Sequence, residues 1–276
     1  MAAIALALGA SLAWGLGDFF GPLKGRTLGT LRALVYVQLS GLAAIVLVVA
    51  IRWQGPKGAA ALLAIPAAFS GTLGLYAYYR GAAVGALSIV SPIAGISAIV
   101  PVIVGVASGD RPSPWQLLGM ACSLGGVFLA SRDPSRSGSR LAAGVGLALI
   151  AALGFGGYFP PMHAAGIADF WWAALIFRIT STAVIVAAVT RARSSIRVEP
   201  RQVSALALIG VADMLGNLLF AAASSSGLVS ITSVLASLYP VITVVLARIV
   251  LEERVARSQE VGIALTLAGV ALISAG

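Results

Sequence analysis

Long apolar runs separated by short polar connections fill almost the whole chain. The runs are about 20 residues long, which is the length that an α-helix needs to cross ~30 Å of hydrocarbon. They are too long for the strands of a membrane barrel and do not alternate between apolar and polar residues as those strands do. The pattern predicts an all-α integral membrane protein with ten transmembrane helices. The predicted spans are residues 2–21, 33–51, 59–79, 86–107, 114–131, 141–161, 168–190, 203–223, 228–250 and 258–275.

The composition also indicates that lipid is the main solvent of the protein. Hydrophobic residues make up 59% of the chain and charged residues 10%, whereas a soluble domain is about 25% charged. A chain with so few charges cannot cover a water-facing surface, and none of its connections is long enough to form a soluble domain. We therefore expect a multi-pass protein of a cell membrane, in particular the cytoplasmic membrane of a prokaryote.

The net charge of +9 resides in the short connections. No patch combines basic and aromatic side chains, so nucleic acid is not an expected partner. Basic connections instead favour contact with anionic headgroups and set the orientation in the membrane. The expected partners are the lipid bilayer and a small-molecule substrate, and we expect a monomer or a homodimer.

The chain also repeats itself. Residues 109–131 and 252–274 align without gaps and share nine identities in 23 positions. Three shorter pairs follow the same order at nearly the same offset, which is unlikely for chance matches between apolar segments. We therefore predict two homologous units of five helices, residues 1–133 and 141–276. The shorter pairs are 85–91 with 227–233, 70–74 with 212–216, and 6–15 with 147–156.

The number of helices in each unit determines how the two units are related. Five is odd, so the second unit crosses the membrane in the opposite sense to the first. Such inverted repeats have a central site between their halves and are typical of alternating-access transporters. Residues 114–131 and 258–275 carry the longest match and no charge in mid-span, so we expect these two helices at the periphery, where they brace the repeats.

Short motifs add a family resemblance. Trp14-Gly15 and its counterpart Phe155-Gly156 resemble the WG signature of EamA-type transporters, and the stretch 238–274 resembles the end of that family's repeat. The resemblance to this branch of the drug/metabolite transporter superfamily implies ten helices in two inverted five-helix repeats and the export of metabolites.

Three ionisable residues lie inside predicted spans, where each charge costs at least ~2.5–3.5 kcal/mol and normally faces a cavity or a partner. They are Asp18, Arg178 and Asp213. One interpretation gives them a role in substrate binding; the other is a buried Arg178–Asp213 pair that fixes two helices. The charges are not duplicated between the units, which favours specialised roles. The positions equivalent to Asp18, Arg178 and Asp213 in the other unit hold Phe159, Gln38 and Gly71, respectively.

Other candidates for the substrate site are polar or aromatic. Asn217 follows Asp213 by four residues and so lies on the same helical face, where it either holds a substrate amine or hydroxyl or forms an interhelical hydrogen bond. Aromatic rings in a central cavity offer flat apolar or cation-π surfaces, although ordinary packing is the alternative. The aromatic candidates are Trp14, Phe155, Tyr158, Tyr79 and Tyr239.

A carboxylate in a poorly hydrated cavity can carry a proton, because burial disfavours its charged form. Asp18 is the preferred coupling or cation-recognition group, since it lies four residues after Trp14 on the same face. Arg178 can hold Asp213 ionised, which makes that pair structural or gating. Protons are therefore candidate partners.

The sequence contains no motif for catalysis, metal binding or a cofactor, so we expect no enzyme, no metal and no cofactor. The function that fits is a secondary transporter that exports a small organic metabolite or amphipathic drug. A facilitative permease or exchanger, and a membrane-embedded scaffold or enzyme, are the alternatives.

The positive-inside rule predicts the orientation. The connections on the face reached after the first span hold 14 basic residues and those on the other face hold 3, with Arg178 inside a span. The basic-rich face is predicted to be cytoplasmic, and both termini are predicted to lie on the outside.

Overall fold

The protein is described by a computed structural model that covers residues 1–84, 90, 94–130, 141–250 and 257–275; within these ranges all regular elements are helices. Both parts of the chain begin with long helices and end with shorter ones. The first part contains α1 (Ala2–Leu28), α2 (Thr30–Arg52), the 3-10 helix η1 (Ala59–Leu63), α3 (Ala64–Val84), the 3-10 helix η2 (Ile96–Ala98), α5 (Ile99–Ala107) and α6 (Pro114–Ala130). The second contains α7 (Leu141–Arg191), α8 (Pro200–Ser224), α9 (Val229–Ala236), α10 (Tyr239–Val250) and α11 (Arg257–Ala275).

Several of these helices match the thickness of a membrane. Five described segments are long and apolar enough to cross one, and four shorter apolar helices accompany them. The longest segment, Gly146–Arg191, has 46 residues. At 1.5 Å per residue it extends about 69 Å, more than twice the ~30 Å hydrocarbon core. It therefore contains enough helix for two crossings, provided that it turns.

The turn occurs at Asp169. Its backbone leaves the helical region (φ −164°, ψ 100°), and its Oδ1 accepts hydrogen bonds from the amides of Trp171 at 3.1 Å and Trp172 at 3.3 Å. This is the geometry of an N-cap, which satisfies the free amides of a new helix. The apolar pattern of the sequence predicted a connection between spans 141–161 and 168–190. The chain stays helical up to Asp169 instead, because the next helix is capped directly there.

Two other boundaries differ from the sequence prediction. The predicted span 228–250 is divided into α9 and α10 at Ser237–Leu238. Pro240 explains the break, because it has no N–H to bond the carbonyl of Ala236. Helix α1 continues seven residues beyond the predicted end at residue 21 in spite of Pro22. The predicted span 86–107 lies partly outside the described residues.

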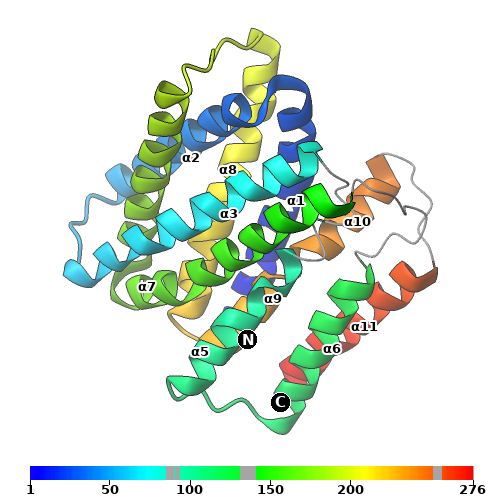
Figure 1. Ribbon diagram of the computed structural model, residues 1–276. Coiled ribbons are helices and arrows are strands. Elements are labelled where there is room, and N and C mark those ends of the chain that lie inside the picture. The colour runs from blue at the N-terminus through cyan, green and yellow to red at the C-terminus, as the bar shows by residue number, and fades with distance from the viewer. Residues whose placement is uncertain (85–89, 91–93, 131–140, 251–256, 276) are drawn as a thin grey trace.

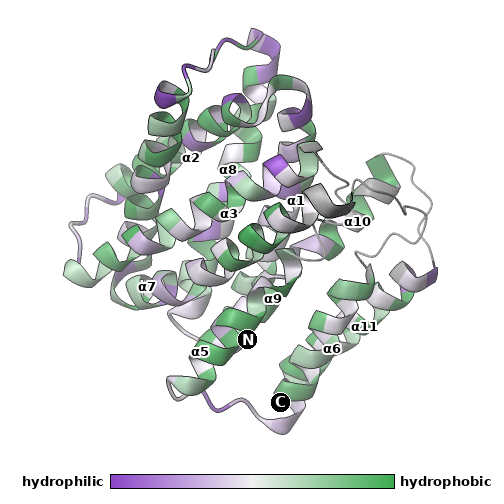
Figure 2. Cartoon of the chain, in the orientation of Figure 1, coloured by the Kyte–Doolittle hydropathy of each residue, from purple (hydrophilic) through white to green (hydrophobic). Residues whose placement is uncertain are grey.

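The long helices cross one another in a bundle, and α6 and α11 lie side by side at its edge (Figure 1). α1 packs against α8, α3 against α7, and α2 against both α7 and α8. Hydrophobic residues predominate along these helices (Figure 2), and many of their large hydrophobic side chains are exposed. Such an arrangement presents apolar side chains to lipid.

Glycines bring α6 and α11 into backbone contact. A Cβ atom on Gly126 would lie 2.6 Å from the carbonyl oxygen of Gly262, and one on Gly269 would lie 2.5 Å from that of Gly119. Close approach through small residues is the usual way to join helices in lipid. The peripheral position expected for these two helices is confirmed, and the structure shows in addition that they pair with each other.

Hydrogen bonds show which connections share a face of the bundle. The turn between α1 and α2 lies beside the α7–α8 connection, because Lys24 Nζ donates to Gln202 Oε1 at 2.7 Å and Arg32 Nε donates to the carbonyl of Ser195 at 2.9 Å. The segment after α2 lies beside the kink of α7, where Trp172 Nε1 donates to the carbonyl of Gln54 at 2.9 Å.

Candidate functional site

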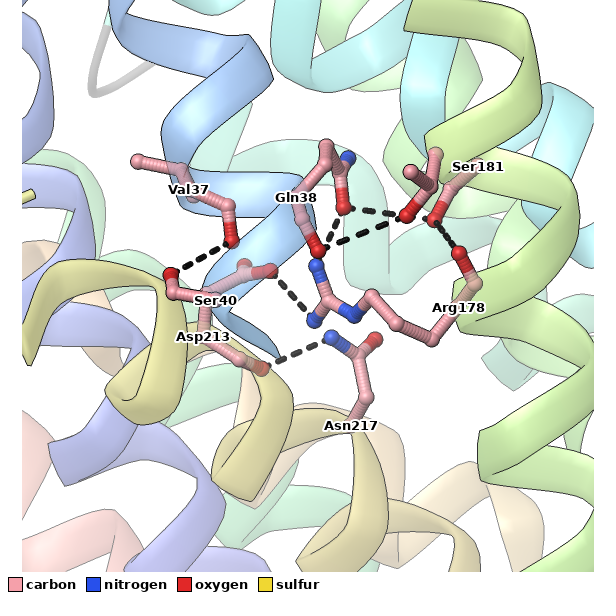
Figure 3. A network of polar contacts seen from close by, with 8 residues as sticks. Val37, Gln38, Ser40, Arg178, Ser181, Asp213 and Asn217 are labelled. Atoms are coloured by element: carbon pink, nitrogen blue, oxygen red, sulfur yellow. Dashed lines mark hydrogen bonds and ion pairs between the residues drawn. The ribbon is translucent and has the colours of Figure 1, made fainter. Parts of the chain in front are cut away.

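A charged network lies at the centre of the bundle, where α2, α7 and α8 meet (Figure 3). Arg178 on α7 has an exposed fraction of 0%. Its Nη2 donates to Asp213 Oδ2 on α8 at 2.7 Å, and its Nη1 donates to Gln38 Oε1 on α2. The Arg178–Asp213 pair considered from sequence is therefore present as an ion pair, and the charges of its two members cancel.

Neighbouring groups hold this network in place. Ser181 Oγ donates to Gln38 Oε1 at 3.3 Å, and Thr182 Oγ1 donates to the carbonyl of Gln38 at the same distance. A Cβ atom on Gly41 would lie 3.1 Å from the guanidinium carbon of Arg178. Glycine at this position leaves the room that the buried guanidinium requires.

A cavity adjoins the network. Helices from both parts of the chain line it: α1, α2 and α3 from the first, and α7, α8 and α10 from the second. Its lining combines polar side chains with aromatic rings. The polar side chains are Asp18, Gln38, Thr72, Asp213 and Asn217, and the rings belong to Trp14, Phe155, Tyr158, Phe159, Phe177 and Tyr239.

Most of the site residues expected from sequence meet at this cavity. Seven of them line it: Trp14, Asp18, Phe155, Tyr158, Asp213, Asn217 and Tyr239. Arg178 is not among the lining residues and binds two that are. Tyr79 is not among them either, because its hydroxyl packs against Gly21 and its ring against Gly25 on α1. Asp18, Arg178 and Asp213 all face the interior of the bundle, as predicted.

Asn217 also lies on the face expected for it. Its Nδ2 donates to the backbone carbonyl of Asp213, one turn earlier on α8, at 2.7 Å. The amide is thereby oriented beside the ion pair and at the wall of the cavity. The i,i+4 spacing was the signal that connected these two residues in the sequence.

Six lining residues were not proposed from sequence: Gln38, Gly71, Thr72, Leu75, Phe159 and Phe177. The repeat alignment offered a signal for half of them. Phe159, Gln38 and Gly71 occupy the positions equivalent to Asp18, Arg178 and Asp213. These three residues, aligned with the predicted charges, were therefore candidates as well.

The two aromatic-glycine motifs make equivalent contacts. Gly216 on α8 has no room for a Cβ atom beneath the ring of Trp14, and a Cβ atom on Gly74 of α3 would lie 2.8 Å from Phe155 Cδ1. The motif glycines behave alike: Gly15 packs against Ile242 of α10, and Gly156 packs against Val100 of α5. Each motif thus joins its helix to two helices of the other part of the chain.

Aromatic contacts extend from both motifs. Trp14 lies 5.9 Å from Tyr158 and 6.1 Å from Phe220, measured between ring centroids. Phe155 lies 6.0 Å from Tyr78 and 6.3 Å from Tyr239. Each cluster includes two rings that line the cavity.

The described residues form helices, five segments of which are long and apolar enough to cross a membrane, and these helices surround a cavity with polar side chains. The chain matches the model of the EamA-like transporter family over residues 1–132 and 142–275, and it belongs to that family. The family is one of membrane transporters within the drug/metabolite transporter superfamily.

Comparison with solved structures supports the fold alone. A chain described as "Crystal structure of protein" superposes with a TM-score of 0.78 at 14% sequence identity, and the match covers 98% of this chain and 94% of that one. Comparison with curated proteins gives no significant match.

Proposed function

We propose that this protein is a secondary transporter that exports a small organic metabolite or amphipathic drug across the cytoplasmic membrane by alternating access. The observation that carries the proposal is the position of the cavity, which is lined by helices of both halves. A site between two halves becomes accessible from either face when the halves rock against each other. Seven of the nine residues proposed from sequence line this cavity and Arg178 binds two lining residues, whereas Tyr79 packs against α1 instead.

We propose further that the fold consists of ten crossings in two inverted units, residues 1–133 and 141–276. The contacts Trp14–Gly216 and Phe155–Gly74 support this. The repeat alignment matches Trp14 with Phe155 and Gly216 with Gly74, so the two contacts are equivalent. The contacts of Gly15 with Ile242 and of Gly156 with Val100 are related in the same way. A two-fold relation between the halves accounts for both equivalences.

The positions of the connections support the inversion. The turn after α1 shares a face with the α7–α8 connection, whereas the kink of α7 shares a face with the segment after α2. In the repeat register, the turn after α1 corresponds to the kink of α7. The turn after α1 and the kink of α7 are thus equivalent connections that lie on different faces of the bundle. This is expected for units of opposite orientation.

Transport can be tested in proteoliposomes loaded with a pooled metabolite extract. We expect protein-dependent loss of particular solutes by mass spectrometry, and we expect Asn217→Trp, which fills the cavity, to slow that loss at least ~10-fold. The exposed variant Leu208→Trp, on the same helix, serves as the matched control and should transport normally. Equal loss of all solutes from vesicles with and without the protein would contradict the proposal.

Orientation can be tested with single cysteines. Cys122 is the only native cysteine, so Cys122→Ser provides a background for Ser195→Cys in the α7–α8 connection and Gly55→Cys after α2. The positive-inside bias predicts that a membrane-impermeant thiol reagent applied to intact cells labels residue 55 and not residue 195. Labelling of residue 195 alone would reverse the predicted topology.

A further inference from the structure

Asp18 is the carboxylate that the central network leaves out. Its exposed fraction is 7%, and it lines the cavity. Within the described part of the chain no hydrogen bond or ion pair is made to its side chain, whereas Asp213 is paired with Arg178 at 2.7 Å. A charged group buried without a partner is unfavourable unless something in the site compensates it. The cavity therefore holds one carboxylate without a counterion.

The backbone at this residue adds a second acceptor. Pro22 follows Asp18 by four residues inside α1 and has no N–H to bond the carbonyl of Asp18. A freed carbonyl in a membrane helix is tolerated where it lines a cavity or meets another partner. The carboxylate and this carbonyl belong to the same residue, so two oxygen acceptors are concentrated at one level of α1.

The repeat shows that packing does not require a carboxylate at this position. The equivalent residue, Phe159, packs its ring against Phe220 at 4.9 Å and Tyr158 at 5.3 Å. In the first unit, the positions equivalent to Phe220 and Tyr158 hold Tyr78 and Gly17. One unit fills the position with an apolar ring, whereas the other places a carboxylate there. The carboxylate is better explained by what enters the cavity than by the demands of the fold.

The rest of the lining indicates the shape and charge of the ligand. Aromatic rings on α1, α7 and α10 surround the cavity, and their faces attract cations as well as flat apolar groups. An anion would be repelled by Asp18. A second positive charge on the ligand would find no free carboxylate in the lining, because Asp213 is neutralised by Arg178.

We infer that the cavity binds a monovalent organic cation with a flat apolar body, and that the positive group of this cation pairs with Asp18. This inference names the substrate class of the proposed transporter and so rests on the proposed function. It gives the unequal halves distinct tasks: Asp18 recognises the charge, and the Arg178–Asp213–Gln38 network holds the helices that form the polar wall.

The inference is tested by binding of three probes to the purified protein in detergent, measured by calorimetry. Phenyltrimethylammonium is a permanent cation, 2-phenylethanol is neutral and phenylacetate is an anion, and all three carry one phenyl ring. We expect the cation to bind roughly tenfold or more tightly than the other two, as for one contact with a charged group. Equal affinities in the wild type, or a preference for the anion, would overturn the inference.

Variants identify the residue responsible. Asp18→Asn keeps the size of the side chain and should lose most of the preference for the cation while still binding 2-phenylethanol, which shows that the cavity is intact. The control Glu199→Gln removes an exposed carboxylate far along the chain and should keep the preference. An Asp18→Asn protein that retains the full preference for phenyltrimethylammonium would also overturn the inference.

Protons should compete with the permanent cation for Asp18. The other titratable or charged groups at this site are Asp213 with its partner Arg178, Tyr79 on α3, Tyr158 on α7 and Tyr239 on α10. We expect acidification to weaken phenyltrimethylammonium binding by the wild type and to leave the Asp18→Asn protein unaffected. Parallel pH profiles of the two proteins would contradict this assignment.

Failure of the inference is distinguishable from failure of the proposed function. If the vesicles export neutral or anionic solutes and the purified protein shows no preference for the cation, transport stands and the substrate class is wrong. If the purified protein prefers the cation and no solute crosses the vesicle membrane, the binding site stands and transport is wrong.

Discussion

Replacing Arg178 by methionine is expected to destabilise the protein by about 3–5 kcal/mol, because it leaves the carboxylate of Asp213 inside the bundle without its cation. The arginine is fully buried, and the exposed fraction of the Asp213 side chain is 14%. Gln38 would lose its charged donor at the same time. The measurement is the free energy of unfolding in detergent, followed by far-ultraviolet circular dichroism.

The second half of this prediction concerns the double variant. Asp213→Asn alone should also destabilise the protein, since it leaves the guanidinium buried without an anion. Combined with Arg178→Met it removes both charges, so we expect the double variant to be more stable than Arg178→Met alone. A double-mutant cycle then measures the interaction energy of the pair.

The chain provides a matched control for this ion pair. Arg201 Nε and Glu199 Oε2 are also 2.7 Å apart, but the two side chains are 82% and 63% exposed. Exposed pairs contribute about 0–1 kcal/mol, so Arg201→Met should have little effect. If Arg178→Met were no more harmful than Arg201→Met, the central network would not stabilise the bundle.

Gly154→Leu should disrupt the crossing of α3 and α7. A Cβ atom on Gly154 would lie 2.6 Å from the Cα of Gly74 and 2.8 Å from the carbonyl oxygen of Ser70, so it meets backbone atoms that cannot rotate away. The helices must separate, and Phe155 and the cavity wall must move with them. Overpacking typically costs about 1–3 kcal/mol, and a collision between backbones belongs at the upper end or beyond.

Gly146→Leu is the control for this variant, because it lies on the same helix and a Cβ atom there meets nothing within 4 Å. Both substitutions replace glycine by a good helix former, so the difference between them reports the collision alone. We expect Gly154→Leu to lower the melting temperature in detergent and to abolish export from vesicles, with Gly146→Leu close to the wild type. Normal stability of Gly154→Leu would disprove the close crossing of these helices.

The candidate site was predictable in part because buried charges are rare in apolar helices. Asp18, Arg178 and Asp213 were conspicuous for this reason, and the structure brings all three to the interior of the bundle. Gln38 was not conspicuous, since a single amide in an apolar run has many possible roles. Its importance depends on the crossing of α2 and α7, which brings it to Arg178.

Tyr79 illustrates the opposite case. An aromatic residue in mid-helix was a reasonable candidate for the lining, but the pattern along one helix does not say which neighbour its ring meets. Gly21 and Gly25 on α1 offer a groove, and the ring of Tyr79 occupies it. The identity of residues on a second helix decided its place.

Residue order along the chain is enough to predict that lipid is the main solvent of this protein and that its sequence is duplicated. Apolar runs of membrane length exclude a water-facing surface, and the four aligned segment pairs indicate duplication, because both are properties of residue order along the chain. The pairing of Arg178 with Asp213 and Gln38, and the lack of a partner for Asp18 among the described residues, follow from the tertiary structure alone. Those pairings join residues up to 140 positions apart, and they depend on helix crossings set by side-chain packing rather than by local sequence.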